Sequence, residues 1–571
     1  MVETSRSPLL SVDRLTIDFR SASGRIVQAV RDVSFQIFSE QTLAVVGESG
    51  SGKSVTSLAI MGLLPKRAVR VRDTSAIFFK GNDLLKLSHS HMRALRGRKI
   101  SMIFQDPMSS LNPVFPVGFQ LSEMLRVHKG MSRKVAHEKT LDLLHEVGIA
   151  EPLRRVNAYP HELSGGQQQR VMIAMALSME PDLLIADEPT TALDVTIQRQ
   201  IVQLLLSLQA KRRMAMIFIT HDLALVSEFA HHAVVMRAGR VVEAGEVVEV
   251  FTRPKNTYTK ALLMCRPGAN KPGHRLKVLE DFISLRDVSS QEHRPQYNDK
   301  YPAKFGKVLL EVRNLKKVFD RRVHLFKTEK FIAVRDISFS IRQGQTLGIV
   351  GESGSGKTTT ALCILRLMKF NSGQIFFDGI DLLKMSKDQI SSYKRRVQIV
   401  FQNPFGSLNP RFTVWQILEE PMILHGLGSS DIERRSRACT LLEQVGLPSD
   451  SLNRYPHEFS GGQRQRISIA RALALTPSLI VCDEPVSSLD VSVQAQILNL
   501  LKDLQQELGL SYLFISHDLE VVRHMSNELI VMRDGVIVEE GPAEVLYSRP
   551  SHSYTKELLN ASPRLSSFVA Q

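Results

Sequence analysis

The sequence predicts an α/β fold that is built twice along one chain. One set of motifs occurs in both halves, and from Ser164 onward equivalent residues, such as Ser164 and Ser460, lie 296 positions apart. Each copy alternates short apolar runs with helix-like stretches, a pattern typical of a largely parallel core sheet. The chain has 571 residues, which is more than one ordinary hydrophobic core accommodates. We therefore expect two α/β domains of the same design.

The predicted domain boundaries follow from the limits of the repeat. We assign residues 1–266 to the first domain and residues 308–571, with a short C-terminal extension, to the second. Residues 267–307 are rich in Pro, Gly, charged and polar residues, which favours a linker, although Leu276 to Leu285 has enough apolar residues to dock on a neighbour. The offset between the copies is 304 residues at Lys53 and 296 residues from Ser164 onward, so the first copy carries eight additional residues. Most of them fall between Pro65 and Asp73.

Composition and charge restrict the class of protein. The chain is 43% apolar and 23% charged, and no stretch approaches 18 consecutive apolar residues, so we expect no transmembrane helix. The N-terminus runs into a strand pattern without an apolar core region, which argues against a signal peptide. The formal net charge of +15 has three open interpretations: a diffusely basic surface, attraction to anionic lipid, or nucleic-acid binding.

The four cysteines are widely spaced, and none forms a C-x-x-C pair that would indicate a zinc or iron–sulfur site. We expect buried free thiols in a reducing compartment. The four are Cys265, Cys363, Cys439 and Cys482.

A glycine-rich segment of the form G-x-x-x-x-G-K-[ST] follows a strand-like apolar run in each copy. This is the phosphate-binding P-loop: glycines let the backbone N–H groups turn toward a polyphosphate, and the lysine adds a positive charge. The final hydroxyl is a ligand for Mg²⁺. The predicted phosphate-binding residues are Gly47, Glu48, Ser49, Gly50, Ser51, Gly52, Lys53 and Ser54 in the first copy and Gly351, Glu352, Ser353, Gly354, Ser355, Gly356, Lys357 and Thr358 in the second.

Two acidic residues end a later apolar run in each copy. A buried strand that ends in carboxylates places them at the carboxyl edge of the sheet, beside the P-loop. We expect Asp187 and Asp483 to hold Mg²⁺ together with the P-loop hydroxyls of Ser54 and Thr358. The residues that follow them, Glu188 and Glu484, are the predicted general bases that activate the attacking water.

A Ser-Gly-Gly-Gln segment precedes a predicted helix in each copy. One interpretation is a helix N-cap with a glycine turn. The other is a second anion cradle that closes over the nucleotide of the other copy. The residues concerned are Ser164, Gly165, Gly166 and Gln167, and Ser460, Gly461, Gly462 and Gln463.

Together these motifs resemble those of a tandem ATP-binding-cassette ATPase, and the resemblance covers nearly the whole chain. It implies two P-loop NTPase domains, each with a RecA-like core, an antiparallel β subdomain and a helical subdomain. It also implies a head-to-tail pairing of the two domains, in which each Ser-Gly-Gly-Gln segment faces the other domain's ATP. Further residues then acquire roles: Gln105 and Gln402 as glutamine-loop residues at the Mg²⁺ and the water, His221 and His517 as switch histidines, and Phe19 and Phe319 as adenine-stacking aromatics.

Local details are similar to those of the oligopeptide, dipeptide, nickel and glutathione importer ATPases. Ser-Leu-Asn-Pro follows each glutamine loop, Tyr-Pro-His-Glu precedes each Ser-Gly-Gly-Gln, and each copy ends in Tyr-Thr-Lys-x-Leu-Leu. The resemblance implies an ATPase that drives uptake of peptides or related small solutes through two separate transmembrane permease subunits. An extracytoplasmic solute-binding protein would take part indirectly. The chain would be peripheral, at the cytoplasmic face of the inner membrane, with no nucleic-acid partner.

Two alternatives remain open at this point. A soluble tandem cassette that acts on ribosomes or nucleic acid fits the basic charge, but ribosome-acting relatives carry a long, charged helical arm between the copies. An exporter's ATPase shares every catalytic motif, and only the Tyr-Thr-Lys segments and the fused pairing argue against it.

Overall fold

The computed structural model describes residues 7–20, 24, 26–65, 67–191, 193–270, 273–283, 305–324 and 327–562. The described residues form two compact units. Residues 7–193 and 197–263 make up the first, and residues 194–196 and 264–562 make up the second. Residues 284–304 of the predicted linker lie outside the described residues, whereas its first part belongs to the second unit.

A six-stranded sheet forms the centre of the first unit, in the order β11-β10-β3-β9-β8-β7. All neighbouring strands are parallel except β10 and β11. Residues in β3 and β8 are buried throughout, as expected for strands whose two faces are both covered. The strands are β3 (Thr42–Val46), β7 (Ile100–Ile103), β8 (Leu183–Asp187), β9 (Ala215–Thr220), β10 (His232–Arg237) and β11 (Arg240–Glu246).

A second, antiparallel sheet packs against the parallel one through a shared core that includes Leu15, Ile77, Val45 and Ile217. Among the described residues, strand β4 pairs with β1, and it lies between Pro65 and Asp73, where most of the additional residues of the first copy fall. The strands are β1 (Leu10–Arg20), β2 (Ile26–Ile37), β4 (Val69–Val71), β5 (Ala76–Phe79) and β6 (Asn82–Asp83).

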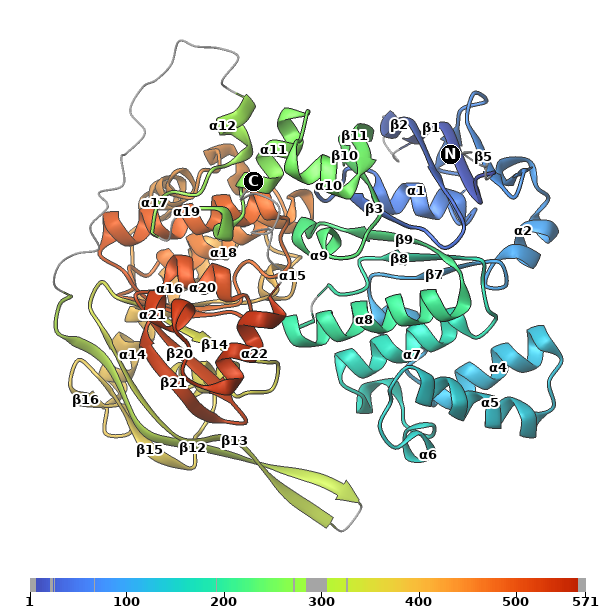
Figure 1. Ribbon diagram of the computed structural model, residues 1–571. Helices are drawn as coiled ribbons and strands as arrows, with labels where there is room; N and C mark the ends of the chain where they lie inside the picture. The colour runs from blue at the N-terminus through green and yellow to red at the C-terminus, as the bar shows by residue number, and fades with distance from the viewer. Residues whose placement is uncertain are drawn as a thin grey trace. The chain divides into compact units, whose positions relative to one another are not determined.

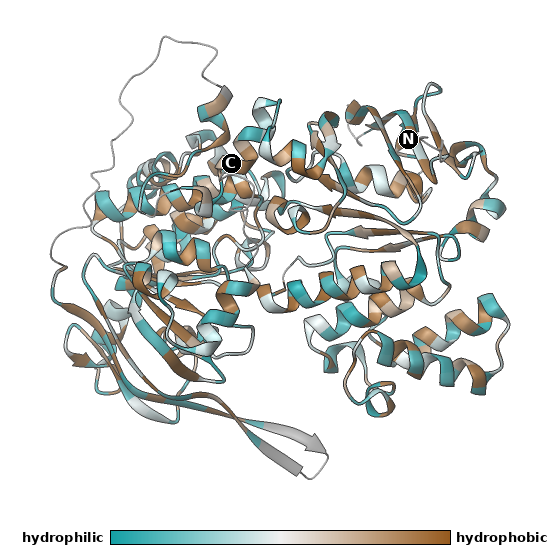
Figure 2. Ribbon diagram, viewed as in Figure 1, coloured by the Kyte–Doolittle hydropathy of each residue, from teal (hydrophilic) through white to brown (hydrophobic). Residues whose placement is uncertain are grey.

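Helices cover both faces of the parallel sheet of the first unit, with α1 on one side and α7 and α8 on the other (Figure 1). Figure 2 shows α7 and α8 alternating between apolar and polar residues, as expected for helices with one buried side. The helices are α1 (Lys53–Ile60), α2 (His89–Leu95), α3 (Pro107–Ser110), α4 (Val117–Lys129), α5 (Arg133–Glu146), α6 (Pro152–Arg155), α7 (Gly165–Leu177), α8 (Val195–Arg212), α9 (Leu223–Ser227), α10 (Val247–Thr252) and α11 (Thr257–Met264).

The second unit repeats this design. Its six-stranded sheet has the order β17-β18-β19-β14-β20-β21, and its antiparallel sheet has the order β13-β12-β15-β16. The strands are β12 (Val308–His324), β13 (Lys327–Arg342), β14 (Thr346–Val350), β15 (Ser372–Phe377), β16 (Ile380–Asp381), β17 (Val397–Val400), β18 (Leu479–Asp483), β19 (Ser511–Ile515), β20 (Glu528–Arg533) and β21 (Val536–Pro542).

The second unit also begins with a short helix, α12, that precedes its first strand. The helices are α12 (Leu279–Ile283), α13 (Lys357–Ile364), α14 (Lys387–Arg396), α15 (Pro404–Ser407), α16 (Val414–Leu424), α17 (Asp431–Gln444), α18 (Gly461–Leu473), α19 (Val491–Leu508), α20 (Leu519–Met525), α21 (Ala543–Ser548) and α22 (Ser553–Ala561).

Alternation along β18 shows how the sheet joins two cores. Leu479 and Val481 enter the core shared with the antiparallel sheet, whereas Ile480 and Cys482 enter the core under the helices. Successive side chains of a strand point to opposite faces, so an all-apolar strand fills both cores. The predicted fold, two α/β domains each with an antiparallel and a helical part, is confirmed. Among the described residues, no helix combines the length and apolar content needed to span a bilayer.

The buried histidine His524 predicts a pH-dependent stability. It is 1% exposed, and neither ring nitrogen has a hydrogen-bond partner among the described residues. Burial, with the nearby Lys502 of α19 and His274, lowers the pKa of His524 to about 3. The unfolded chain therefore binds a proton below pH 6.5 that the folded chain does not, so stability falls as the pH drops from 6.5 toward 3.

Lowering the pH from 7 to 5 should cost about 2 kcal/mol through His524 alone. We expect His524→Leu to reduce the difference between the thermal unfolding midpoints at pH 7 and pH 5. The exposed His137 of α5 provides the control, because His137→Leu should leave that difference unchanged. An equal pH dependence in wild type and His524→Leu would contradict the prediction.

Candidate functional site

The P-loops connect the central strand of each sheet to a helix, β3 to α1 and β14 to α13. Close backbone approach requires a glycine at the first position of each loop. A Cβ at Gly47, where φ is +150°, would lie 2.2 Å from the carbonyl oxygen of Met236, and Gly351 meets Met532 at the same 2.2 Å. Gly52 is left-handed, and no side chain caps the start of α1. The first N–H groups of the helix are thus available to an anion.

The P-loop lysines are buried within their own loops. Lys53 is 5% exposed, and its Nζ donates to the carbonyl oxygens of Gly47 at 2.7 Å and Glu48 at 2.8 Å. Lys357 makes the same bonds to Gly351 and Glu352 at the same distances. Burial lowers the pKa of Lys357 despite the acidic groups around it.

In each copy, the P-loop hydroxyl donates a hydrogen bond to the aspartate that ends a central strand, β8 or β18. The hydroxyl of Ser54 donates to Asp187 Oδ1 at 3.1 Å, and that of Thr358 donates to Asp483 Oδ1 at 3.1 Å. Burial raises the pKa of Asp187 to about 6, although the hydrogen bond from Ser54 opposes the shift. An acid whose charge is poorly solvated favours a nearby cation. The oxygen donors present, carboxylate and hydroxyl, are those that Mg²⁺ prefers.

Three polar side chains lie against the carboxylate of the neighbouring residue, Glu188. Glu188 Oε2 accepts from Gln105 Nε2 at 3.0 Å and from the hydroxyl of Thr191 at 2.9 Å, and it lies 3.5 Å from His221 Nδ1. Burial raises the pKa of Glu188, but the hydrogen bond and charge of His221 outweigh it and bring the pKa to about 2. The carboxylate is therefore ionised at neutral pH and able to accept a proton.

The second unit has the same arrangement. Gln402 Nε2 donates to Glu484 Oε2 at 2.8 Å, and His517 Nδ1 lies 3.1 Å from the same oxygen. Burial raises the pKa of Glu484, but His517, Lys357 and Ser487 together bring that pKa below its usual value. Burial lowers the pKa of His517, but Glu484 and Asp518 together bring that pKa above its usual value. The two glutamates also share a left-handed backbone, with φ of +47° at Glu188 and +49° at Glu484.

Other predicted residues lie apart from these groups within each unit. Ser164 and Ser460 cap α7 and α18 and form capping boxes with Gln167 and Gln463. In the described part of the chain, the hydroxyl of each serine accepts from the backbone N–H of its own helix start, Gln167 or Gln463, at 3.3 Å. This matches the N-cap interpretation and leaves the cradle role a prediction.

The predicted adenine-stacking aromatics lie in the antiparallel sheets. Phe19 in β1 and Phe319 in β12 are partly buried. Lys317 Nζ lies 4.8 Å from the centre of the Phe319 ring.

Two tyrosines outside the predicted site residues contact the P-loops. The hydroxyl of Tyr258 donates to Glu48 Oε2 at 3.2 Å and accepts from the Glu48 backbone N–H at 3.3 Å. In the second copy, the Glu352 N–H donates to the Tyr554 hydroxyl at 3.1 Å. Both belong to the repeated Tyr-Thr-Lys segment, and that repetition is the signal that could have pointed to them. They hold the start of each P-loop in place, although they lie 210 and 202 positions further along the chain than the glutamates they contact.

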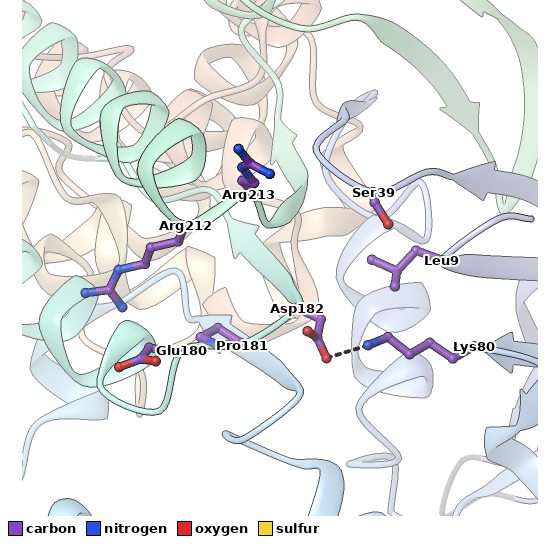
Figure 3. Close-up of a pocket in the computed structure, with 8 residues that line it drawn as sticks. All are labelled: Leu9, Ser39, Lys80, Glu180, Pro181, Asp182, Arg212 and Arg213. Atoms are coloured by element: carbon purple, nitrogen blue, oxygen red, sulfur yellow. Dashed lines mark hydrogen bonds and ion pairs between the residues drawn. The ribbon is translucent and has the colours of Figure 1, made fainter. Parts of the chain in front are cut away.

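The first unit also contains a small pocket at the other end of its sheet (Figure 3). Its residues Ser39, Asp182 and Arg213 precede β3, β8 and β9, whereas the P-loop follows β3. The carboxylate of Asp182 forms ion pairs with Lys80 at 2.9 Å and Lys99 at 3.3 Å. The pocket is therefore separate from the P-loop, the acids and the histidine.

Two family models match the chain. The model described as "ABC transporter" matches residues 30–191 and 334–487, one stretch in each copy. The model described as "Oligopeptide/dipeptide transporter, C-terminal region" matches residues 242–282 and 538–568.

Several similar proteins align with nearly the whole chain. A "Peptidoglycan transport ATP-binding protein YejF" of Agrobacterium fabrum is 46% identical, over 98% of this chain and 98% of that protein. An "Uncharacterized ABC transporter ATP-binding protein YejF" of Escherichia coli is 47% identical, over 97% of this chain and 99% of that protein. A "Glutathione import ATP-binding protein GsiA" of Salmonella typhimurium is 47% identical, over 98% of this chain and 90% of that protein.

Proposed function

The chain belongs to the ABC transporter family, and from this premise we propose that it is the ATP-hydrolysing subunit of an importer for peptides or related small solutes. The observation that carries the proposal is the complete set of groups in each unit. Each has a P-loop lysine, an acid bonded to the P-loop hydroxyl, and a glutamate that contacts a glutamine and a histidine. Neither copy has lost a charged group of this set.

The proposed reaction is attack of water on the terminal phosphate of ATP. Glu188 and Glu484 are ionised and accept the proton of the water. His221 and Gln105 hold Glu188 in place, as His517 and Gln402 hold Glu484. Mg²⁺, when bound by Asp187 with Ser54 or by Asp483 with Thr358, would neutralise charge on the phosphates, with Gln105 and Gln402 as further ligands.

The proposed domain organisation keeps residues 1–266 and 308–571 as the two ATPase domains. We propose that they pair within one chain, so that Ser164–Gln167 serve the ATP at Lys357 and Ser460–Gln463 serve the ATP at Lys53. Exposed Ser164 and Ser460 at helix starts support this role, because the N–H groups there attract phosphate. Phe19 and Phe319 remain the proposed adenine contacts.

The proposed partners are two transmembrane permease subunits, with an extracytoplasmic solute-binding protein acting indirectly. The chain would then be peripheral at the cytoplasmic face of the inner membrane. The match of both copies to the transporter C-terminal region supports an importer of this kind. It weighs against an exporter or a cassette that acts on ribosomes or nucleic acid.

The test is reconstitution of the chain with its permease subunits in lipid vesicles, with candidate solutes added alongside the solute-binding protein. Peptides, glutathione and nickel are compared in turn. We expect one of these solutes to raise ATP hydrolysis several-fold and to accumulate inside the vesicles. Solute-independent hydrolysis together with absent uptake for all three would contradict import of this class.

A further inference from the structure

The segment that follows the last helix of the first copy is part of the second unit. This docked segment, residues 264–270 and 273–283, contains Cys265 and Leu276, which are 0% and 1% exposed within the core of the second unit. Val278 packs against the same core. The match to the transporter C-terminal region reaches residue 282, so this segment is part of that family feature.

One buried amide fixes the docked segment to α19. Asn499, which is 2% exposed, accepts from the Leu276 N–H at 2.9 Å and donates to the Leu276 carbonyl oxygen at 2.9 Å. Its side chain thus satisfies both backbone groups of a buried residue. Removing it would leave both buried backbone groups of Leu276 without this partner, which would loosen the docked segment.

Charged groups extend the contact to a second helix. Arg275 pairs with Asp503 of α19 at 3.2 Å, and Gln496 of α19 donates to Glu280 of α12 at 2.9 Å. Arg266 lies 3.8 Å from Glu520 of α20, and both side chains are mostly buried. A Cβ at Gly268 would lie 2.4 Å from the Glu520 carboxyl group, so a side chain there would displace it.

The first copy lacks the residues that receive the segment. At the offset of 296, Asn499, Asp503 and Glu520 correspond to Gln203, Ser207 and Ala224. None of these three offers the same short amide or carboxylate. The docking residues are therefore specific to the second copy.

The two helices that the segment joins follow residues of the ATP site. Helix α20 begins directly after His517, with Asp518 as its N-cap, and α19 begins seven residues after Glu484. We propose that the docked segment braces α19 against α20 and thereby holds His517 beside Glu484 in the second copy. This rests on the proposed ATPase function, and it makes Asn499 and Glu520 positioning residues for the second site.

The test compares Asn499→Ala with the matched variant Gln203→Ala in the full chain. We expect Asn499→Ala to lower kcat for ATP by up to about twofold, since the first site is unaltered, and to leave KM nearly unchanged because the P-loop is intact. Hydrogen exchange of the α20 amides should accelerate. Gln203→Ala should change neither kcat nor the exchange of α9, the equivalent helix.

A charge reversal separates positioning from a general loss of stability. Arg266→Glu should lower kcat, and adding Glu520→Arg should restore it. Unchanged kcat and unchanged α20 exchange in Asn499→Ala, or the absence of rescue, would overturn the bracing role. If the wild-type chain did not hydrolyse ATP at all, the proposed function would fail, and the exchange of α20 would still decide whether the segment braces the helix.

Discussion

Replacing Glu188 and Glu484 together by glutamine should lower ATP turnover by about 10²- to 10⁴-fold while ATP binding persists. Glutamine keeps the size of the side chain, but its amide cannot take a proton from water. The pKa of about 2 at Glu188 means that the wild-type carboxylate is ready to do so at neutral pH. The measurements are steady-state phosphate release and equilibrium ATP binding by the full chain.

The control for this experiment is a pair of glutamates away from the site. Glu138 of α5 and Glu443 of α17 are exposed, so Glu138→Gln with Glu443→Gln should retain wild-type turnover. If the double variant of Glu188 and Glu484 hydrolysed ATP at the wild-type rate, neither residue would be the base. A matching loss of ATP binding would instead indicate damage to the P-loop region.

Replacing both P-loop lysines by methionine should weaken ATP binding by about 100-fold, which corresponds to the loss of a strong charge-assisted contact with phosphate. Lys53 and Lys357 are buried, and methionine retains most of the apolar stem that fills the loop. Methionine removes a buried charge but leaves the P-loop carbonyl oxygens without their donor, so we expect only a modest fall in the thermal unfolding midpoint. Titration of ATP against wild type and the double variant checks the affinity.

The exposed Lys134 on α5 provides a matched lysine, and Lys134→Met should bind ATP as the wild type does. An unchanged dissociation constant for the double lysine variant would show that phosphate binds elsewhere in the chain. A large fall in the unfolding midpoint would make the affinity result a consequence of misfolding.

Much of the site was predictable because its chemistry restricts residue type at short spacing. A P-loop needs glycines where the backbone approaches Met236 and Met532, and a hydroxyl next to the lysine. The acid pairs end apolar strands, so their place at the sheet edge follows from strand direction alone. These signals are local, and one copy predicts the other.

The remaining contacts depend on distant parts of the chain. Tyr258 reaches Glu48 across 210 positions, and no local pattern marks a tyrosine as a P-loop support. Asn499 reaches Leu276 across 223 positions, and an asparagine inside an amphipathic helix has no distinctive spacing. The composition of residues 267–307 favours a linker. Leu276 within it is nevertheless buried, because the folded second unit provides a core that receives it.

The left-handed backbone of Glu188 and Glu484 has a consequence for selection experiments. A residue with a side chain in that region is disfavoured by about 1–2 kcal/mol, and glycine is not. Mutagenesis screened for heat tolerance alone would thus enrich glycine or asparagine at these two positions and discard the carboxylates. Any programme that evolves a more heat-resistant version of this chain must select for turnover at every round, because thermal resistance and the proposed role of these glutamates in hydrolysis favour different residues at positions 188 and 484.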